Sequence, residues 1–91
     1  MLFDVDGDVC SIRDIQENTD TDFRAQYRGN TIHCWLDTDD FTPEDNRYYI
    51  QVTHNESGMK DYDGWMPEEA GSDLHSAVVE AIRGACLTRR S

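Results

Sequence analysis

Ninety-one residues, of which 37% are hydrophobic and 10% aromatic, suit one folded domain spanning residues 1–91 with a single modest core. Nineteen acidic side chains against eight basic ones give a formal net charge of −11 at pH 7. A field of this sign repels nucleic acid and anionic membranes, which argues against direct binding of either, and it attracts basic protein surfaces.

The N-terminal residues predict a β-hairpin. Two short strands, Leu2–Val5 and Asp8–Ile12, flank Asp6-Gly7, a dipeptide that supports the positive φ angles of a tight turn. The second strand can continue to Ile15, and the polar stretch Asn18–Asp22 is expected to end this unit as a turn.

The centre of the chain predicts three further strands, in which apolar and polar side chains alternate with the period of two that is typical of a half-buried strand. These strands are residues 23–28, 31–36 and 47–54. Gly29-Asn30 provides the turn between the first two, and we expect the third to pair with the second. His33 and Trp35 fall on the opposite face of their strand from Ile32.

Two connections complete the path to the C-terminal region. Residues 37–46 form an acidic connection in which Thr42 and Pro43 can start a short helical turn. Residues 55–71 are expected to be mostly loop, anchored by the adjacent side chains of Trp65 and Met66.

The C-terminal region predicts the one long helix. Ser72 or Asp73 is expected to cap it, and Gly84 weakens its last turn by roughly 1 kcal/mol relative to Ala. Its apolar stripe at helical spacing consists of Leu74, Val78, Ala81, Ile82, Ala85 and Cys86. Together the elements predict an α+β fold, an antiparallel sheet of four or five strands with one C-terminal helix packed on a face.

The cysteines and the lack of long apolar runs indicate a cytoplasmic protein. Cys10, Cys34 and Cys86 are odd in number and lie in apolar patterns, so we expect three buried thiols in a reducing compartment. No apolar run approaches the ~20 residues needed to span a bilayer, and the acidic N-terminus does not have the pattern of a signal peptide. A zinc site of Cys34, His33 and His54 lacks the usual ligand spacing, so neither a metal nor a cofactor is expected.

Residues 2–9 read Leu-Phe-Asp-Val-Asp-Gly-Asp-Val and resemble the first motif of the haloacid-dehalogenase-like phosphatases. The resemblance implies Asp4 as a nucleophile and Asp6 as an acid and base beside magnesium. The rest of the chain departs from that family, because it is too short for a doubly wound sheet and lacks an alternating strand–helix pattern. The hairpin turn explains the same residues more simply.

The same acids do not form an EF-hand calcium loop. Such a loop needs Gly at its sixth position and Glu at its twelfth, and these positions hold Val9 and Ile15.

His33, His54 and His75 do not form a recognisable catalytic triad with a Ser or Cys nucleophile, and no glycine-rich phosphate loop is present. We therefore expect a protein that binds a partner and is not an enzyme.

Pairs of aspartates two residues apart recur along the chain. In an extended strand such side chains point the same way and lie about 6.6–7 Å apart, close to twice the ~3.4 Å charge spacing of a DNA strand. Such rows could imitate a phosphate backbone, although Asp also simply favours turns and solvated surfaces. The pairs are Asp4/Asp6, Asp6/Asp8, Asp20/Asp22, Asp37/Asp39 and Asp61/Asp63.

Two acid-rich segments are the candidate partner-binding surface, one at residues 37–45 and one at residues 56–73. The second also carries Trp65, which is either an exposed interface anchor or an ordinary core residue. The candidate partner-binding residues are Asp37, Asp39, Asp40, Glu44, Asp45, Asp61, Asp63, Trp65, Glu68 and Glu69.

In size, charge and lack of catalytic motifs the chain resembles the compact inhibitors that phages and other mobile elements carry, namely anti-CRISPR proteins and DNA-mimicking antirestriction proteins. The resemblance implies a non-enzymatic inhibitor that occludes a basic nucleic-acid-binding groove of a host CRISPR effector or nuclease without turnover. The alternatives are a generic acidic interaction domain from a halophilic organism and, third, a metal-dependent phosphatase-like fragment.

Overall fold

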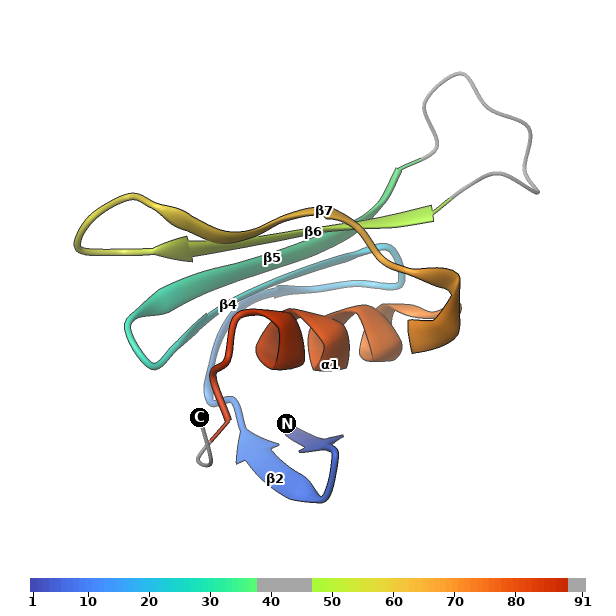
Figure 1. Ribbon diagram of the computed structural model, residues 1–91, viewed down its shortest axis with the longest axis horizontal. Helices are drawn as coiled ribbons and strands as arrows, with labels where there is room; N and C mark the ends of the chain where they lie inside the picture. Colours follow the sequence, from blue (N-terminus) through green and yellow to red (C-terminus); the bar gives the residue numbers. More distant parts are fainter. Residues whose placement is uncertain (38–46, 89–91) are drawn as a thin grey trace.

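The main element of the fold is a five-stranded antiparallel sheet whose strands lie in chain order (Figure 1). The computed structural model describes residues 1–37 and 47–88. The strands are β3 (Asp14–Asn18), β4 (Asp22–Tyr27), β5 (Asn30–Asp37), β6 (Arg47–His54) and β7 (Lys60–Trp65). Each strand after β3 pairs with the strand before it, so the central strand is β5 and the edges are β3 and β7.

A separate hairpin precedes the sheet, formed by β1 (Leu2–Val5) and β2 (Asp8–Ser11). Its turn is the predicted Asp6-Gly7, with φ angles of 55° and 89°. The Asp4 side chain stabilises this turn by accepting a hydrogen bond from the Gly7 backbone N–H at 2.9 Å. The expected continuation of the second strand to Ile15 is wrong, because the chain leaves the hairpin after residue 12 and joins the other sheet as β3.

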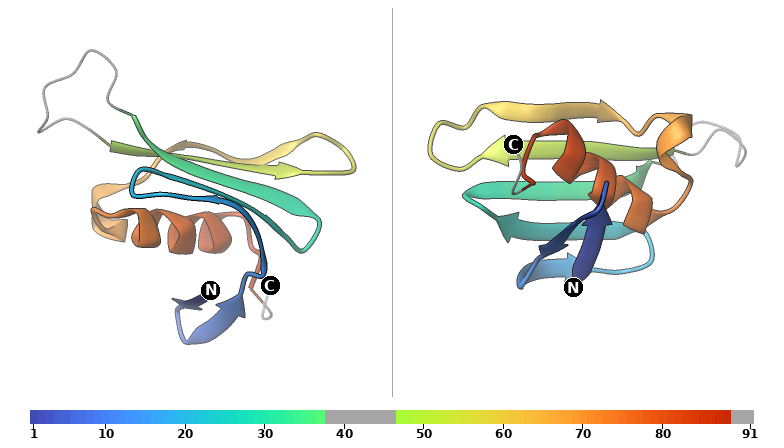
Figure 2. Two further views of the ribbon diagram at one scale, coloured as in Figure 1. Left: turned by 180° about the vertical axis from the view of Figure 1, so that it is seen from behind. Right: turned by 60° about the horizontal axis from the view of Figure 1, so that its bottom comes forward.

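The helix α1 (Leu74–Gly84) lies between the five-stranded sheet and the hairpin, and Figure 2 shows it crossing the strands at an angle. Asp73 caps it, because its side chain accepts a hydrogen bond from the Ser76 N–H at 2.8 Å. At the other end Arg83 donates two hydrogen bonds to the Asp6 carboxylate, at 2.8 and 3.1 Å, and so joins the helix to the hairpin turn. A short 3-10 turn, η2 (Glu68–Ala70), connects β7 to this helix.

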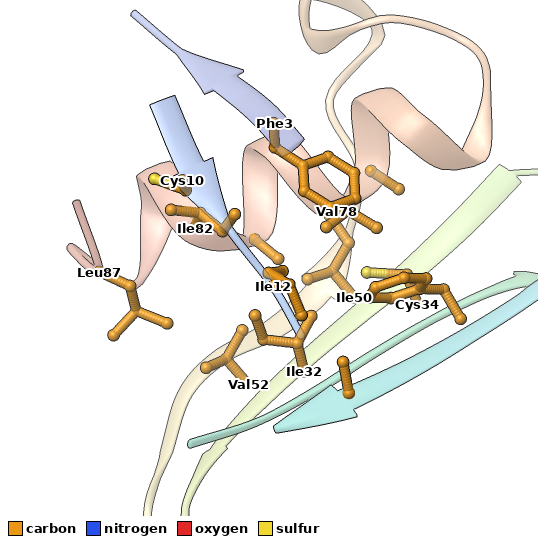
Figure 3. Packing of buried hydrophobic residues seen from close by; sticks show 14 of the residues in the cluster. Phe3, Cys10, Ile12, Ile32, Cys34, Ile50, Val52, Val78, Ile82 and Leu87 are labelled. Atoms are coloured by element: carbon orange, nitrogen blue, oxygen red, sulfur yellow. The ribbon is translucent and has the colours of Figure 1, made fainter. Parts of the chain in front are cut away.

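The core lies on the helix side of the sheet and is closed from below by the hairpin. In Figure 3, Ile12 lies between the sheet residues Ile32 and Ile50 and the helix residue Ile82. Each such side chain stabilises the fold by roughly 1.5–3 kcal/mol when it is fully removed from water. The buried apolar residues are Phe3, Val5, Cys10, Ile12, Phe23, Ala25, Ile32, Cys34, Ile50, Val52, Met66, Ala77, Val78, Ala81, Ile82 and Leu87.

The predicted α+β fold, with an antiparallel sheet and one C-terminal helix packed on it, is confirmed. The expectation that residues 55–71 are mostly loop is wrong, because they contain β7. Within β7 only Tyr62 and Gly64 are partly buried, so the strand has almost no apolar pattern and is defined by its backbone pairing with β6. Of the expected Trp65-Met66 anchor, Met66 is buried and Trp65 is 42% exposed.

The turn between β4 and β5 is Arg28-Gly29 rather than the predicted Gly29-Asn30. Both turn residues have positive φ angles, 51° and 77°, as a tight two-residue hairpin loop requires. Asn30 instead begins β5 opposite Tyr27, where it is buried and donates a hydrogen bond to the carbonyl oxygen of Arg28 at 2.9 Å.

Cys10 and Cys34 are buried as predicted, but Cys86 is exposed, so the expectation of three buried thiols is wrong at that position. The helix ends at Gly84, and Cys86 has a φ of 58° that takes it off the helical stripe, while Leu87 occupies the buried position. Burial raises the pKa of the Cys34 thiol to about 12.

Among the described residues no helix is long and apolar enough to cross a membrane. Thr42 and Pro43 lie outside the described residues.

Candidate functional site

The face of the sheet opposite α1 is left uncovered by the rest of the described chain, and we call it the open face (Figure 1). Strand alternation decides which side chains it carries. In β5, Ile32 and Cys34 point into the core, and His33 and Trp35 therefore point to the open face. In β6, Ile50 is buried in the same way, which turns Tyr49 outward.

Four rings form a continuous row across three strands of the open face. The backbone register pairs Trp35 with Tyr49, and Tyr49 with Trp65. The ring centroids of Trp35 and Tyr49 are 5.0 Å apart, and those of Tyr49 and Trp65 are 5.1 Å apart. The His33 ring continues the row at 4.4 Å from Trp35. We call these four residues, His33, Trp35, Tyr49 and Trp65, the aromatic strip.

A carboxylate is held at each end of the aromatic strip. Asp63, on β7, accepts hydrogen bonds from the Tyr49 hydroxyl at 2.8 Å and from the Gln51 amide at 3.2 Å. The bond from Tyr49, and then that from Gln51, lowers the pKa of Asp63 below its usual value, and the same bond raises the pKa of Tyr49. At the other end the Asp22 carboxylate lies 3.1 Å from Nε2 of His33.

The borders of the strip are polar. Beside His33 an open hollow of about 520 Å³ is lined by Gln16, Glu17, Asp22, Arg24 and His33. The guanidinium of Arg24 lies 3.5 Å from Nδ1 of His33, so one of the chain's own cations already occupies this border. Further along the same face, Gln26, Thr31 and Asn55 hydrogen-bond to one another through their side chains.

The candidate partner-binding residues occupy different places in the fold. Asp63 and Trp65 lie on the open face, at the strip, and Asp61 is an exposed residue at the register shift of β7. Asp37 ends β5, while Glu68 and Glu69 are in η2, where Glu68 lies 3.9 Å from the Arg47 guanidinium. Asp39, Asp40, Glu44 and Asp45 lie outside the described residues.

Trp65 is an exposed ring, so its interpretation as a core anchor is wrong. Tyr62 shows which face of β7 Trp65 occupies. The Tyr62 side chain points to the helix and donates a hydrogen bond to Glu80 at 2.9 Å. With Tyr62 facing inward, Trp65 three positions later faces the open side and packs edge-on against Tyr49, at an interplanar angle of 81°.

The sequence-based selection missed Trp35, Tyr49, His33, Gln51 and Asp22. The alternation in residues 31–36 and 47–54 already placed the first three rings on the faces opposite the apolar residues. The signal was therefore present, namely aromatic rings on the polar face of two neighbouring strands. This signal could not predict that Trp65 joins the row from a third strand, because β7 lacks an apolar pattern of its own.

The phosphatase-like motif of residues 2–9 forms a hairpin turn rather than the end of a parallel strand. Asp4 is engaged with the Gly7 N–H and Asp6 with the Arg83 guanidinium. Within the part of the chain that the structure describes, no cluster of three or more His, Cys, Asp or Glu side chains is arranged to hold a metal ion.

Comparison of the chain with protein-family models, with curated proteins and with solved structures found no match in any of the three.

Proposed function

We propose that this protein is a non-enzymatic inhibitor that acts in the cytoplasm by occluding a basic nucleic-acid-binding groove of a host CRISPR effector or nuclease. The observation that carries the proposal is the aromatic strip itself, a row of rings left on an uncovered sheet face, between two carboxylates, in a chain of net charge −11.

Rings and carboxylates have separate parts in such an interface. Exposed Trp and Tyr are the residue types that dominate binding energy in protein interfaces, because each removes a large apolar area from water at a small loss of side-chain entropy. The surrounding acids mainly steer a basic partner toward the face and accelerate association. A partner that normally binds nucleic acid has the complementary positive surface.

The proposed mechanism relies on steering rather than on evenly spaced carboxylates. Of the aspartate pairs two residues apart, only Asp61/Asp63 lies within a single strand of the described residues. Asp6 is in a turn with a φ of 55°, so its two pairs are not extended rows. Regular imitation of phosphate spacing is therefore not required for the proposed occlusion.

The second candidate is a generic acidic interaction domain from a halophilic organism. It is favoured by acids such as Asp20 and Glu56, which are exposed in the connections between strands. In that case the acids serve solubility, and binding to a partner does not depend on them.

A pull-down from host lysate at low and high salt, followed by elution with nucleic acid, tests the proposal. We expect the captured partner to be a nucleic-acid-handling complex that is released by high salt and by its own nucleic acid, because screening weakens attraction between exposed charges. Charge reversal of Asp61, Asp63 and Glu68 to Lys should slow association. Asp61→Lys and Glu68→Lys should each change the free energy of unfolding by less than ~0.5 kcal/mol. Asp63→Lys should cost more, because it also removes the acceptor of the hydrogen bonds from Tyr49 and Gln51. Capture that is indifferent to salt, charge reversal and competing nucleic acid contradicts the inhibitor and leaves the generic acidic domain.

A further inference from the structure

We infer that the β7 end of the aromatic strip is an arginine-binding site, at which a guanidinium of the partner stacks on the rings and hydrogen-bonds to Asp63. This inference rests on the proposed function for the nature of the partner, a basic protein. It goes further in naming the side chain that is recognised and the groups that recognise it.

Asp63 is positioned as a hydrogen-bond acceptor before any partner arrives. The Tyr49 hydroxyl and the Gln51 amide both donate to the same oxygen, Oδ1. Within residues 1–37 and 47–88, no group donates a hydrogen bond to Oδ2 of Asp63, so this oxygen can accept hydrogen bonds from a partner. Two donors on one oxygen fix the orientation of the carboxylate, and the charge remains because these bonds favour the ionised form.

The rings beside Asp63 provide the stacking surface. Tyr49 is in contact with both Trp35 and Trp65 and also holds Asp63, so the rings and the carboxylate form one unit. Trp65 is 42% exposed. A cation within about 6 Å of a ring centroid is attracted by the ring quadrupole, and Trp gives the strongest attraction.

The chain's own cations leave this part of the strip open. Arg24 lies at the far border, beside His33, and Arg47 lies toward Glu68. Lys60 contributes only the last and smallest of the effects on the pKa of Asp63. Among the described residues, no cation forms an ion pair with Asp63.

The geometry favours arginine over lysine. A guanidinium is planar, so it can lie against a ring and still direct its N–H groups sideways to a carboxylate, whereas a lysine ammonium is a compact and strongly hydrated charge. Nucleic-acid bases could also stack on exposed rings, but the Asp63 carboxylate beside the rings and a net charge of −11 oppose the phosphates that accompany them.

The test uses two peptides, hexa-arginine and hexa-lysine, and titrates each into the full-length protein at one ionic strength. The chain has two tryptophans, and both are in the strip, so tryptophan fluorescence reports directly on this site. We expect hexa-arginine to change the emission and to bind about three- to tenfold more tightly than hexa-lysine, the range that a ring–cation contact of modest strength gives.

Three variants and one matched control locate the binding. Asp63→Asn keeps a side chain of the same shape and Trp65→Ala removes the most exposed ring of the strip, and each should remove most of the preference for arginine when measured by calorimetry. Glu56→Gln makes the same change of charge as Asp63→Asn in the β6–β7 loop and should leave the preference unchanged. Tyr49→Phe keeps the ring and removes one of the two donors to Oδ1, so it should give an intermediate loss of the preference. Circular dichroism of each variant checks that the fold is retained.

Equal binding of the two peptides, or an arginine preference that survives both Asp63→Asn and Trp65→Ala, would overturn the inference. So would tighter binding of a single-stranded oligonucleotide than of hexa-arginine, since the strip would then be a base-stacking platform. The peptide test is independent of any host complex. Selective binding of hexa-arginine together with a failed nucleic-acid competition would leave the arginine site standing and remove the inhibitor.

Discussion

At the scale of single residues, exposure separates two kinds of large apolar side chain. Ile50 is completely buried between the sheet and α1, whereas Trp65 is 42% exposed and packs edge-on against Tyr49. Ile50→Ala should lower the free energy of unfolding by 2–5 kcal/mol, because it leaves a cavity in the core. Trp65→Ala should lower it by only about 1 kcal/mol, the value of one aromatic pair, and should act mainly on binding. Urea denaturation followed by circular dichroism measures both, and a larger loss for Trp65→Ala than for Ile50→Ala would contradict the open-face placement.

Tyr62 gives the fold a dependence on alkaline pH. Burial, and then the hydrogen bond to Glu80, raises the pKa of Tyr62 to about 12, above the unfolded value near 10. The folded state therefore holds this proton more tightly, so the stabilisation is complete below about pH 10 and is lost as the pH rises through about 12. The free energy of unfolding should fall over that window, and it should fall less steeply in Tyr62→Phe. Equal slopes for the two proteins would show that other groups control alkaline unfolding.

At the scale of elements, Gly84 joins the last turn of α1 to β7. Helix propensity alone predicts that Gly84→Ala stabilises the helix by roughly 1 kcal/mol. A Cβ built at this position, however, overlaps the Cδ2 and Cε2 atoms of the Tyr62 ring. Gly84→Ala should therefore lower the free energy of unfolding by about 1–3 kcal/mol, as overpacking does.

A double-mutant cycle separates the two effects at Gly84. In a Tyr62→Ala background the ring is absent, so Gly84→Ala should become neutral or stabilising when measured by urea denaturation. The same loss in both backgrounds would mean that the close approach of Tyr62 is not the reason for glycine at this position.

At the scale of the whole molecule, the net charge of −11 opposes the compact state. The described residues contain few ion pairs, and the closest, from Arg83 to Asp6 and to Glu80, share one guanidinium. Screening of the remaining repulsion should raise the melting temperature as sodium chloride increases from about 10 to 500 mM. Differential scanning calorimetry measures the shift. A melting temperature that falls with salt would mean that attractive pairs outweigh repulsion, which contradicts this account of the charge.

The sequence by itself determined the elements whose pattern is local. Alternation in residues 23–28, 31–36 and 47–54, the Asp6-Gly7 turn and the apolar stripe of the helix each depend on neighbours within a few positions. Each appears in the structure, except that Cys86 lies beyond the end of the helix and is exposed. The same alternation placed Trp35 and Tyr49 on the faces away from the core.

Only the tertiary structure decided that β7 forms the third strand of the aromatic strip and that the β1–β2 hairpin packs against α1. β7 contains Lys60, Asp61, Asp63 and Gly64, residue types that are scarce in strands, and it is a strand because β6 supplies its backbone partners. That pairing brings Trp65 opposite Tyr49 and Asp63 opposite Gln51. Register of this kind depends on residues about a dozen or more positions apart, so no local pattern contains it, and the site it assembles is visible only when the strands are side by side.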